Sequence, residues 1–400
     1  MRVRMIQRAV GQGGLFSGAL SAGGKPLRWL YDCGSNQPDA LLREIAAVAQ
    51  DGDIDLLFVS HLDSDHAGGI DRLLSQVAVR EVVLPYLDEA TLIAIIARDV
   101  ARGALSGAFV EAASDLAGWF GSRGVETVTF VGGRDDDAPP GDGPDLPGRP
   151  GDGGEGDVTS KWTREPDAVP DTAMRRSGRR AGLRRAQPDA VLLLSVPGVL
   201  LNWALVPYAH LPPARLMKAF DTALKREFGP LSKKAIVRRA KESSVRERLR
   251  ECYDALWIDH NLVSMALYAG PLEKARAEVW VGPDRRHFSR WRGDGGGWLL
   301  TGDAHLDRRR RRERFLEFYR RFAPLVNVLM LPHHGSIHNH SDIVLDAMPD
   351  LFIGYAAAGP NDYGHPHRGV RDAVEGQGGA SFHQVSHRPK TRLLMDVKLS

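Results

Sequence analysis

A short segment rich in histidine and aspartate follows a predicted buried strand early in the chain. Residues 60–69 read Ser-His-Leu-Asp-Ser-Asp-His-Ala-Gly-Gly and come directly after the apolar run 54–59. Burying so many imidazole and carboxylate groups without partners would be costly. These side chains are, however, the usual ligands of divalent metal ions in proteins. The segment therefore predicts half of a metal site, formed by His61, Asp63, Asp65 and His66.

The composition indicates a protein with a packed core and no strong overall charge. Of its 400 residues, 43% are hydrophobic, and the formal net charge is only +3, so total charge does not indicate a nucleic-acid partner. The only two cysteines, Cys33 and Cys252, argue against a disulfide framework, and we expect a cytoplasmic location. The first residues lack the apolar core of a secretion signal, and the apolar segment 190–206 is too short and too interrupted to span a membrane. No membrane partner is expected.

Strand-like and helix-like segments alternate along the chain, which predicts a layered α/β fold. Strands are expected at 5–10, 15–20, 27–31, 54–59, 80–87, 125–131, 190–194, 199–205, 262–268, 277–281, 298–301, 326–331 and 351–355. Helices are expected at 38–50, 69–75, 89–102, 108–123 and 306–322.

Two segments depart from this alternation within what we expect to be one domain spanning residues 1–400. Residues 133–187 are rich in Gly, Pro and Asp and end in a basic stretch, and we expect a disordered surface insertion there. It would be either a tolerated loop or a tether for an acidic partner. Residues 212–256 are charged and helix-like, and we expect a helical insertion.

Three later segments also place ligand-type residues after predicted strands. Asp303 follows the strand at 298–301, His333 and His334 follow the strand at 326–331, and a turn carries His365 and His367. One such residue alone is more often structural than a ligand. Because α/β folds usually gather sites at one edge of the sheet, we expect these segments to converge.

Taken together, the motifs resemble the metallo-β-lactamase fold, and in particular the ComEC-type hydrolase domain of competence proteins. His61 to His66 resembles the family signature H-x-H-x-D-H, with Asp63 in place of the second histidine. Six motifs occur in the order that the ComEC-type branch has: Val10 to Gly13, Asp32 to Gly34, Ser60 to Gly69, Thr301 to Asp303, His333 to Ser336 and Tyr363 to His367. The two insertions have no counterpart in this resemblance. The membrane spans that accompany the competence protein are not expected in this chain, so DNA transport is not implied.

The resemblance implies an αββα sandwich that holds two divalent metal ions between its sheets. The first metal would take His61 and Asp63, the second would take Asp65 and His66, and Asp303 would bridge them and share the catalytic role with Asp65. A further ligand would be His333, preferred over His334, and His365 would complete the second metal. Asp32 would be a structural support that orients the ligand loop. The substrate-binding residues implied are His334, Ser336 and His367. A turn-stabilising role for Ser336 stays open.

An aspartate at position 63 changes the metal preference that we expect. With three aspartates and a hydroxide, two divalent ions would lie in a nearly neutral shell, which favours Mn²⁺ beside Zn²⁺. Such a shell would attract an anionic substrate less strongly, so positive groups elsewhere would have to help. Arg308 and Arg309 begin a run of arginines shortly after Asp303, and we expect them to bind substrate phosphates. The alternative is a solvated helix face balanced by Glu313 and Glu317.

These expectations lead to a predicted function of binuclear metal-dependent hydrolysis. The metals would lower the pKa of a bound water from about 15.7 towards about 7, and the resulting hydroxide would attack the substrate. A phosphodiesterase or nuclease is expected, so nucleic acid or another phosphodiester is the expected partner. The alternatives are a carboxylic ester, lactone or amide hydrolase, and a conditionally active component of a multiprotein system, such as one for antiviral defence.

Overall fold

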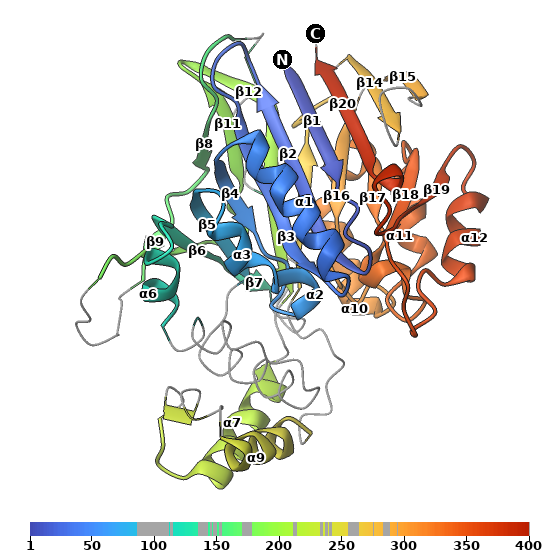
Figure 1. Ribbon diagram of the computed structural model, residues 1–400. Coiled ribbons are helices and arrows are strands. Elements are labelled where there is room, and N and C mark those ends of the chain that lie inside the picture. Colours follow the sequence, from blue (N-terminus) through green and yellow to red (C-terminus); the bar gives the residue numbers. More distant parts are fainter. Residues whose placement is uncertain are drawn as a thin grey trace.

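The computed structural model contains two large β-sheets that face each other, with helices outside both (Figure 1). The structure describes residues 1–85, 112, 115–134, 143–144, 146, 150–151, 154–169, 178–210, 214–232, 235–236, 239, 242–254, 264–274, 276–282, 289–293 and 295–399. The predicted helix at 89–102 lies outside the described residues, as does most of the predicted helix at 108–123 before α6.

The first sheet runs in the order β15-β14-β20-β1-β2-β3-β4-β5-β6-β10-β9. Its strands are β1 (Arg2–Gln7), β2 (Gly13–Ser21), β3 (Leu27–Ser35), β4 (Ile54–Phe58), β5 (Val79–Pro85), β6 (Thr127–Val131), β9 (Asp167–Ala168), β10 (Gly182–Ala186), β14 (Ala277–Gly282), β15 (Ser289–Gly293) and β20 (Leu393–Leu399). Strands β3 to β6 are parallel, whereas β1, β2, β14, β15 and β20 pair in antiparallel fashion.

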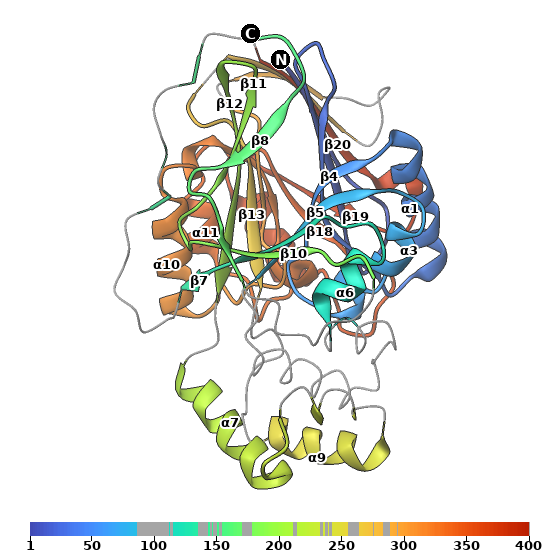
Figure 2. The same cartoon turned by 90° about the vertical axis from the view of Figure 1, so that its left-hand side faces the viewer.

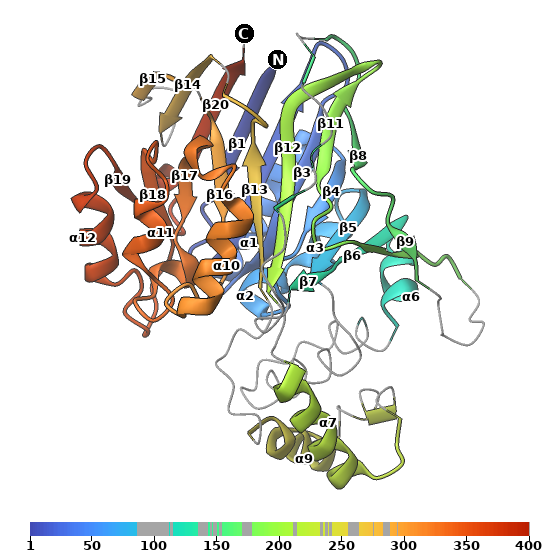
Figure 3. The ribbon, with the colours of Figure 1, turned by 180° about the vertical axis from the view of Figure 1, so that it is seen from behind.

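The second sheet runs in the order β19-β18-β17-β16-β13-β12-β11-β8 (Figure 3). Its strands are β8 (Thr159–Trp162), β11 (Leu192–Val196), β12 (Val199–His210), β13 (Met265–Gly270), β16 (Gly297–Leu300), β17 (Val326–Met330), β18 (Ile353–Ala357) and β19 (Ser381–Val385), and the short β7 (Gly133–Arg134) pairs with the end of β12.

Helices cover the outer faces of both sheets, which gives the four-layer αββα sandwich (Figure 2). The first sheet is covered by α1 (Pro38–Asp51), α3 (Ile70–Leu74) and α6 (Leu116–Gly121), and the second by α10 (Arg309–Tyr319), α11 (Asp342–Asp346) and α12 (Arg368–Gly376). The predicted fold class is therefore confirmed.

A hydrophobic core between the two sheets holds the sandwich together. Trp29 of the first sheet and Trp203 and Trp298 of the second are fully buried in it. The ring of Trp298 meets Phe16 of the opposite sheet edge-on, with centroids 4.9 Å apart. Large aromatic side chains bury much apolar surface, so these contacts stabilise the stacking of the sheets.

Helix α10 shows how the sequence pattern directs a helix onto a sheet. Phe315, Phe318 and Tyr319 lie on one face of the helix and are buried, whereas Arg309 and Glu313 lie on the solvent side. The Tyr319 hydroxyl donates a hydrogen bond to the Val206 carbonyl of β12, 3.0 Å away.

The expectation of a disordered insertion over 133–187 is wrong for several parts of it. Strands β8 and β10 lie within this range, and Trp162 and Ala186 are buried between the sheets. Strand β8 forms the edge of the second sheet, and β10 pairs in parallel with β6 of the first. The high Gly and Pro content gives no local pattern that would predict these two short strands. Each is stabilised by pairing with a distant strand.

The described part of residues 212–256 is helical, and its role as an insertion stays a prediction. It contains α7 (Ala214–Phe228) and α9 (Ser243–Asp254), which pack against each other below the sandwich edge at which α2 (Ser64–Ala67) lies (Figure 1). Their contact includes the buried residues Phe220, Leu224 and Leu249. Among the described residues, no helix has the length and apolar character needed to cross a membrane.

Candidate metal centre

The segment after β4 brings its histidines and aspartates to the lower edge of the first sheet. The chain leaves β4 at Phe58 and turns into α2, whose first residue follows Asp63. The Asp63 side chain makes no capping hydrogen bond to this helix and lies beside His61, with 3.7 Å between Asp63 Oδ2 and His61 Nε2. Both His61 and His66 are buried.

The second sheet supplies the other half of the site. Asp303 follows β16, and its backbone N–H donates a hydrogen bond to Ser264 Oγ, 3.1 Å away. His333 and His334 follow β17 in a tight turn where both have positive φ angles, 49° and 57°. Left-handed backbone costs about 1–2 kcal/mol per non-glycine residue, and such strain is typical of functional sites.

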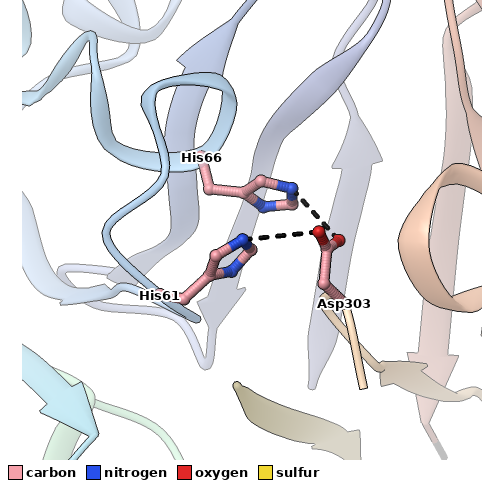
Figure 4. A group of neighbouring side chains, drawn as sticks. All are labelled: His61, His66 and Asp303. Carbon is pink, nitrogen blue, oxygen red and sulfur yellow. Dashed lines mark ion pairs between the residues drawn. The ribbon is translucent and has the colours of Figure 1, made fainter. Parts of the chain in front are cut away.

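The Asp303 carboxylate faces the imidazoles of His61 and His66 (Figure 4), and His333 of the second sheet lies near it as well. Asp303 Oδ2 is 3.4 Å from His61 Nε2 and 3.6 Å from His333 Nε2, whereas Oδ1 is 3.3 Å from His66 Nε2. Each carboxylate oxygen thus faces a different set of nitrogens, as expected of a carboxylate that bridges two ions.

These separations fit a shared metal ion better than direct hydrogen bonds. Two ligand atoms at about 2.0–2.1 Å from one tetrahedral ion lie roughly 3.3 Å apart, while a good N–H···O hydrogen bond measures about 2.9 Å. The Nε2 atoms of His61 and His66 are buried and have no hydrogen-bond partner. A buried nitrogen without a partner is costly unless a ligand binds it. His61, His66 and Asp303 therefore form one group that could hold a metal ion.

Asp65, His66 and His334 form a second, adjacent group of this kind. His334 Nε2 lies 3.2 Å from Asp65 Oδ2, and the rings of His66 and His334 have centroids 5.2 Å apart. From the sequence, His333 was preferred as the ligand and His334 was assigned to substrate. The geometry brings both histidines to the centre: His333 Nε2 faces Asp303, and His334 Nε2 faces Asp65.

All four central imidazoles are held by their Nδ1 atoms. His66 Nδ1 contacts Asp32 Oδ2 at 2.8 Å, His61 Nδ1 contacts Ser60 Oγ at 2.9 Å, His334 Nδ1 contacts the Ala357 carbonyl at 2.8 Å, and His333 Nδ1 contacts Asn339 Oδ1 at 2.9 Å. An Nδ1–H that donates to such an acceptor leaves the Nε2 lone pair free for a metal. The four Nε2 atoms accordingly face the central carboxylates.

Buried Asp32 connects several of these contacts. Its Oδ1 accepts a hydrogen bond from the Ser60 N–H at 2.6 Å, and its Oδ2 accepts from Ser60 Oγ at 2.8 Å and faces His66. Asp32 lies beyond the histidines, so it orients them rather than reaching the central carboxylates. Ser60 and Asn339 were not predicted as site residues; Ser60 adjoins the ligand motif, whereas nothing in the local sequence distinguishes Asn339.

Burial and neighbouring charges shift the pKa values of the cluster in opposite directions. Burial lowers the pKa of His61, and the nearby His66 lowers it further. Burial also acts against a charged His66, but Asp303 and Asp32 raise its pKa well above the usual value. Although burial favours protonation of Asp303, the surrounding His333 and His66 hold its pKa well below the usual range. The carboxylate is therefore ionised and requires positive partners in the folded protein.

Two glycines, Gly34 of the second predicted motif and Gly14 just after the first motif, allow the strands to approach the ligand loop closely. A Cβ atom on Gly34 would come within 2.5 Å of the Asp65 carbonyl carbon and the His66 nitrogen, and one on Gly14 would come within 2.8 Å of Asp32 Cβ. No real Cβ tolerates such distances to backbone. Gly34 and Gly14 thus have a packing role at the site.

Replacing Gly34 with alanine is expected to displace the ligand loop and to lower the free energy of unfolding by about 1–3 kcal/mol, the usual cost of overpacking. Urea denaturation of the variant and the wild type measures this difference. The matched control is Gly376→Ala, where an added Cβ would meet nothing within 4 Å. Equal destabilisation by both substitutions would contradict the packing role of Gly34.

Another predicted ligand, His365, lies at the margin of this centre. It is half-buried, its ring is 5.3 Å from that of His333, and its Nδ1 has no hydrogen-bond partner, but it belongs to neither compact group. Burial, together with His333 and His334, lowers the pKa of His365 to about 4. Its predicted role as a ligand of the second metal therefore stays a prediction, since His334 lies closer to Asp65 and His66.

The remaining predicted substrate residues lie around the centre or outside it. Ser336 Oγ accepts a hydrogen bond from the His338 N–H, which fits the turn-stabilising alternative, and His367 caps α12 by accepting from the Gly369 N–H. Arg308 lies at the N-terminal boundary of α10, and the exposed Arg309 pairs with Glu313 at 2.8 Å, as a solvated helix face would.

The fold is consistent with the metallo-β-lactamase sandwich, and the cluster is a candidate metal centre within it. Residues 28–170 match the Metallo-beta-lactamase superfamily, a range that includes Asp32 and His61 to His66 but not Asp303. Among solved structures, the chain is similar to one titled "Crystal structure of unliganded yeast PDE1", with 12% identity, a TM-score of 0.38, and coverage of 98% of this chain and 99% of that chain. No curated protein matches the sequence.

Proposed function

We propose that this protein is a binuclear metal-dependent hydrolase that cleaves phosphodiesters. The observation that carries this proposal is the common orientation of the four imidazoles, each held at Nδ1 and directed with Nε2 towards an aspartate of the centre. Such an arrangement has no structural use that compensates for burying so many polar groups, whereas it suits metal ions well.

His61 and His66 lie together with Asp303 in one compact group, but they face different oxygens of its carboxylate, which supports two sets of ligands that share Asp303. His61, Asp63 and His333 lie on the side of Asp303 Oδ2, and His66 faces Oδ1 together with the Asp65 and His334 pair. We assign the first set to one divalent ion, zinc or manganese, and the second set to another. Three aspartates among these ligands favour manganese beside zinc.

When bound, such ions lower the pKa of water and act as Lewis acids towards a substrate oxygen. The residues of the chain prepare this chemistry. Asp32 and Ser60 fix the ring orientation of His66 and His61, so that no reorganisation is needed when substrate binds. His365 lies at the margin with an unpartnered Nδ1 and can form a hydrogen bond to a substrate oxygen.

Positive groups near the centre support a phosphodiester over a neutral ester. Arg311 of α10 is buried and lies close enough to His305 and His210 to influence both. Helices α7 and α10 carry further lysine and arginine residues. Phosphate oxygens are the partners that guanidinium groups bind best. A nuclease acting on DNA or RNA is the specific form of this proposal, and a resemblance to the ComEC-type branch remains part of it.

The test is a substrate comparison with manganese- or zinc-loaded protein. Bis(p-nitrophenyl) phosphate, single- and double-stranded DNA, and RNA are compared with p-nitrophenyl acetate and a simple lactone. We expect phosphodiester cleavage that Asp65→Asn lowers by at least about 10²-fold, since this removes one ligand charge. Asp71→Asn, which alters an exposed aspartate paired with Arg123, serves as the control. Cleavage of the acetate or lactone alone would refute the proposal in favour of an ester hydrolase.

A further inference from the structure

A separate pocket lies on the outer face of the first sheet, next to the C-terminal end of α1. Its volume is about 180 Å³. Its lining includes three consecutive small residues of β2, Ser17 to Ala19, and three arginines, Arg4, Arg8 and Arg28. Asp51, which pairs with Arg8, and several apolar side chains complete the lining. Neither the proposed function nor any motif in the sequence accounts for three arginines at this place.

The register of the sheet explains how the pocket forms. Arg4 of β1 and Arg28 of β3 are both paired with Ala19 of the strand between them. Because neighbouring strands lie about 4.8 Å apart, the two arginine Cα atoms are separated by roughly 10 Å, with only a methyl group between them. The short side chain of Ala19 thus leaves a hollow between two long cationic side chains.

The arginines differ in how far their charge is already neutralised. Arg4 pairs with Asp396 at 2.8 Å, and the buried Arg8 donates to Ser17 Oγ at 2.9 Å and to Asp51 Oδ2 at 2.7 Å. Among the described residues, Arg28 donates a hydrogen bond only from its backbone N–H, to Asp55 Oδ2 at 2.9 Å, and its guanidinium makes no hydrogen bond or ion pair. A guanidinium has five N–H donors, so Arg28 retains its full capacity to bind an anion.

The pocket is distinct from the candidate metal centre. Arg28 and Asp32 both belong to β3, four residues apart, which corresponds to about 13 Å along an extended strand. None of the metal-ligand candidates lines the pocket. An anion bound here would therefore not compete with a substrate for the metals.

We propose that this pocket binds a small anion carrying a phosphate group. Several guanidinium forks around one hollow suit the many acceptor oxygens of phosphate, and the volume admits a phosphate or pyrophosphate group. The site does not depend on the proposed hydrolase activity. Free phosphate and the phosphates of a nucleotide share this chemistry, so both enter the test.

The test is calorimetric titration of the full-length protein with inorganic phosphate, pyrophosphate and ADP. We expect binding of at least one probe, and expect Arg28→Ala to weaken it about 10- to 100-fold, the usual effect of losing a charged hydrogen-bond donor. Arg28→Lys keeps the charge but loses the planar fork, so an intermediate loss is expected. Preference for ADP over pyrophosphate would identify a nucleotide as the source of the phosphate.

Two further variants distinguish binding in the pocket from nonspecific attraction of an anion to surface arginines. Ala19→Leu fills the hollow while leaving every charge in place, so it should abolish binding, with thermal melting used to verify that the variant folds. Arg2→Ala removes an exposed arginine of β1 that does not line the pocket, and it should bind as the wild type does. The proposal is overturned if no probe binds, if Arg28→Ala and Ala19→Leu bind normally, or if binding is lost in Asp303→Asn, which alters only the metal centre.

Discussion

Replacing Asp303 with asparagine is expected to lower hydrolysis at least about 10³-fold and to reduce the metal content from about two ions per chain to one or none. Asp303 is the residue whose two carboxylate oxygens face both ligand sets, so the substitution removes the one negative charge that both sets share. Loss of several kcal/mol of transition-state stabilisation corresponds to a rate loss of this size. Elemental analysis and phosphodiester hydrolysis on the same samples measure both effects.

The matched control for this prediction is Asp372→Asn on α12, where an exposed aspartate pairs with Arg368 at 3.4 Å. It should retain two ions and full activity. If Asp303→Asn keeps the metal content of the wild type, the bridging role is wrong. If it loses metal but keeps activity, metal-dependent hydrolysis is wrong.

Removing the metals with a chelator is expected to abolish activity and to lower the melting temperature by about 5–15 °C. A ligand present at 100 to 1,000 times its Kd stabilises the folded state by about 2.7–4.1 kcal/mol, and each kcal/mol shifts the melting temperature of a large domain by about 2–4 °C. The physical cause is that buried Asp303, His61 and His66 lose the ions that offset their desolvation.

Differential scanning calorimetry with and without chelator measures this shift. Adding manganese back should restore both activity and melting temperature. The Asp303→Asn variant should melt at nearly the same temperature with and without chelator, since it holds little metal to lose. If the wild-type protein melts at the same temperature with and without chelator, the cluster is stable without ions.

The architecture could be predicted from the sequence where local patterns are strong. The apolar run before the ligand loop became β4, and the predicted helix at 38–50 became α1 with nearly the same ends. Strands β19 and β20 were not predicted, although β20 alternates buried and less buried residues in a clear strand pattern. Strands β8 and β10 could not be found in this way, because their stability comes from partners far away in the sequence.

The candidate site was predictable in its residue types but not in its pairings. His61, Asp65, His66 and Asp303 come together as the motifs indicate. The relative positions of His333 and His334 depend on two consecutive left-handed residues, a backbone feature that no pattern of residue types reveals. The hydrogen bond between Asn339 and His333 likewise depends on the conformation of the turn that follows β17.

The segment between β6 and β11 contributes strands to the same side of both sheets. One of its strands, β8, lies outermost in one sheet, while β10 extends the other sheet beyond β6. A protein trimmed of residues 133–187 would consequently expose the bare borders of β6 and β11, whose unpaired amide groups can recruit strands from other molecules. We therefore expect shortening of this segment to cause self-association, and not only the loss of a tether for a partner.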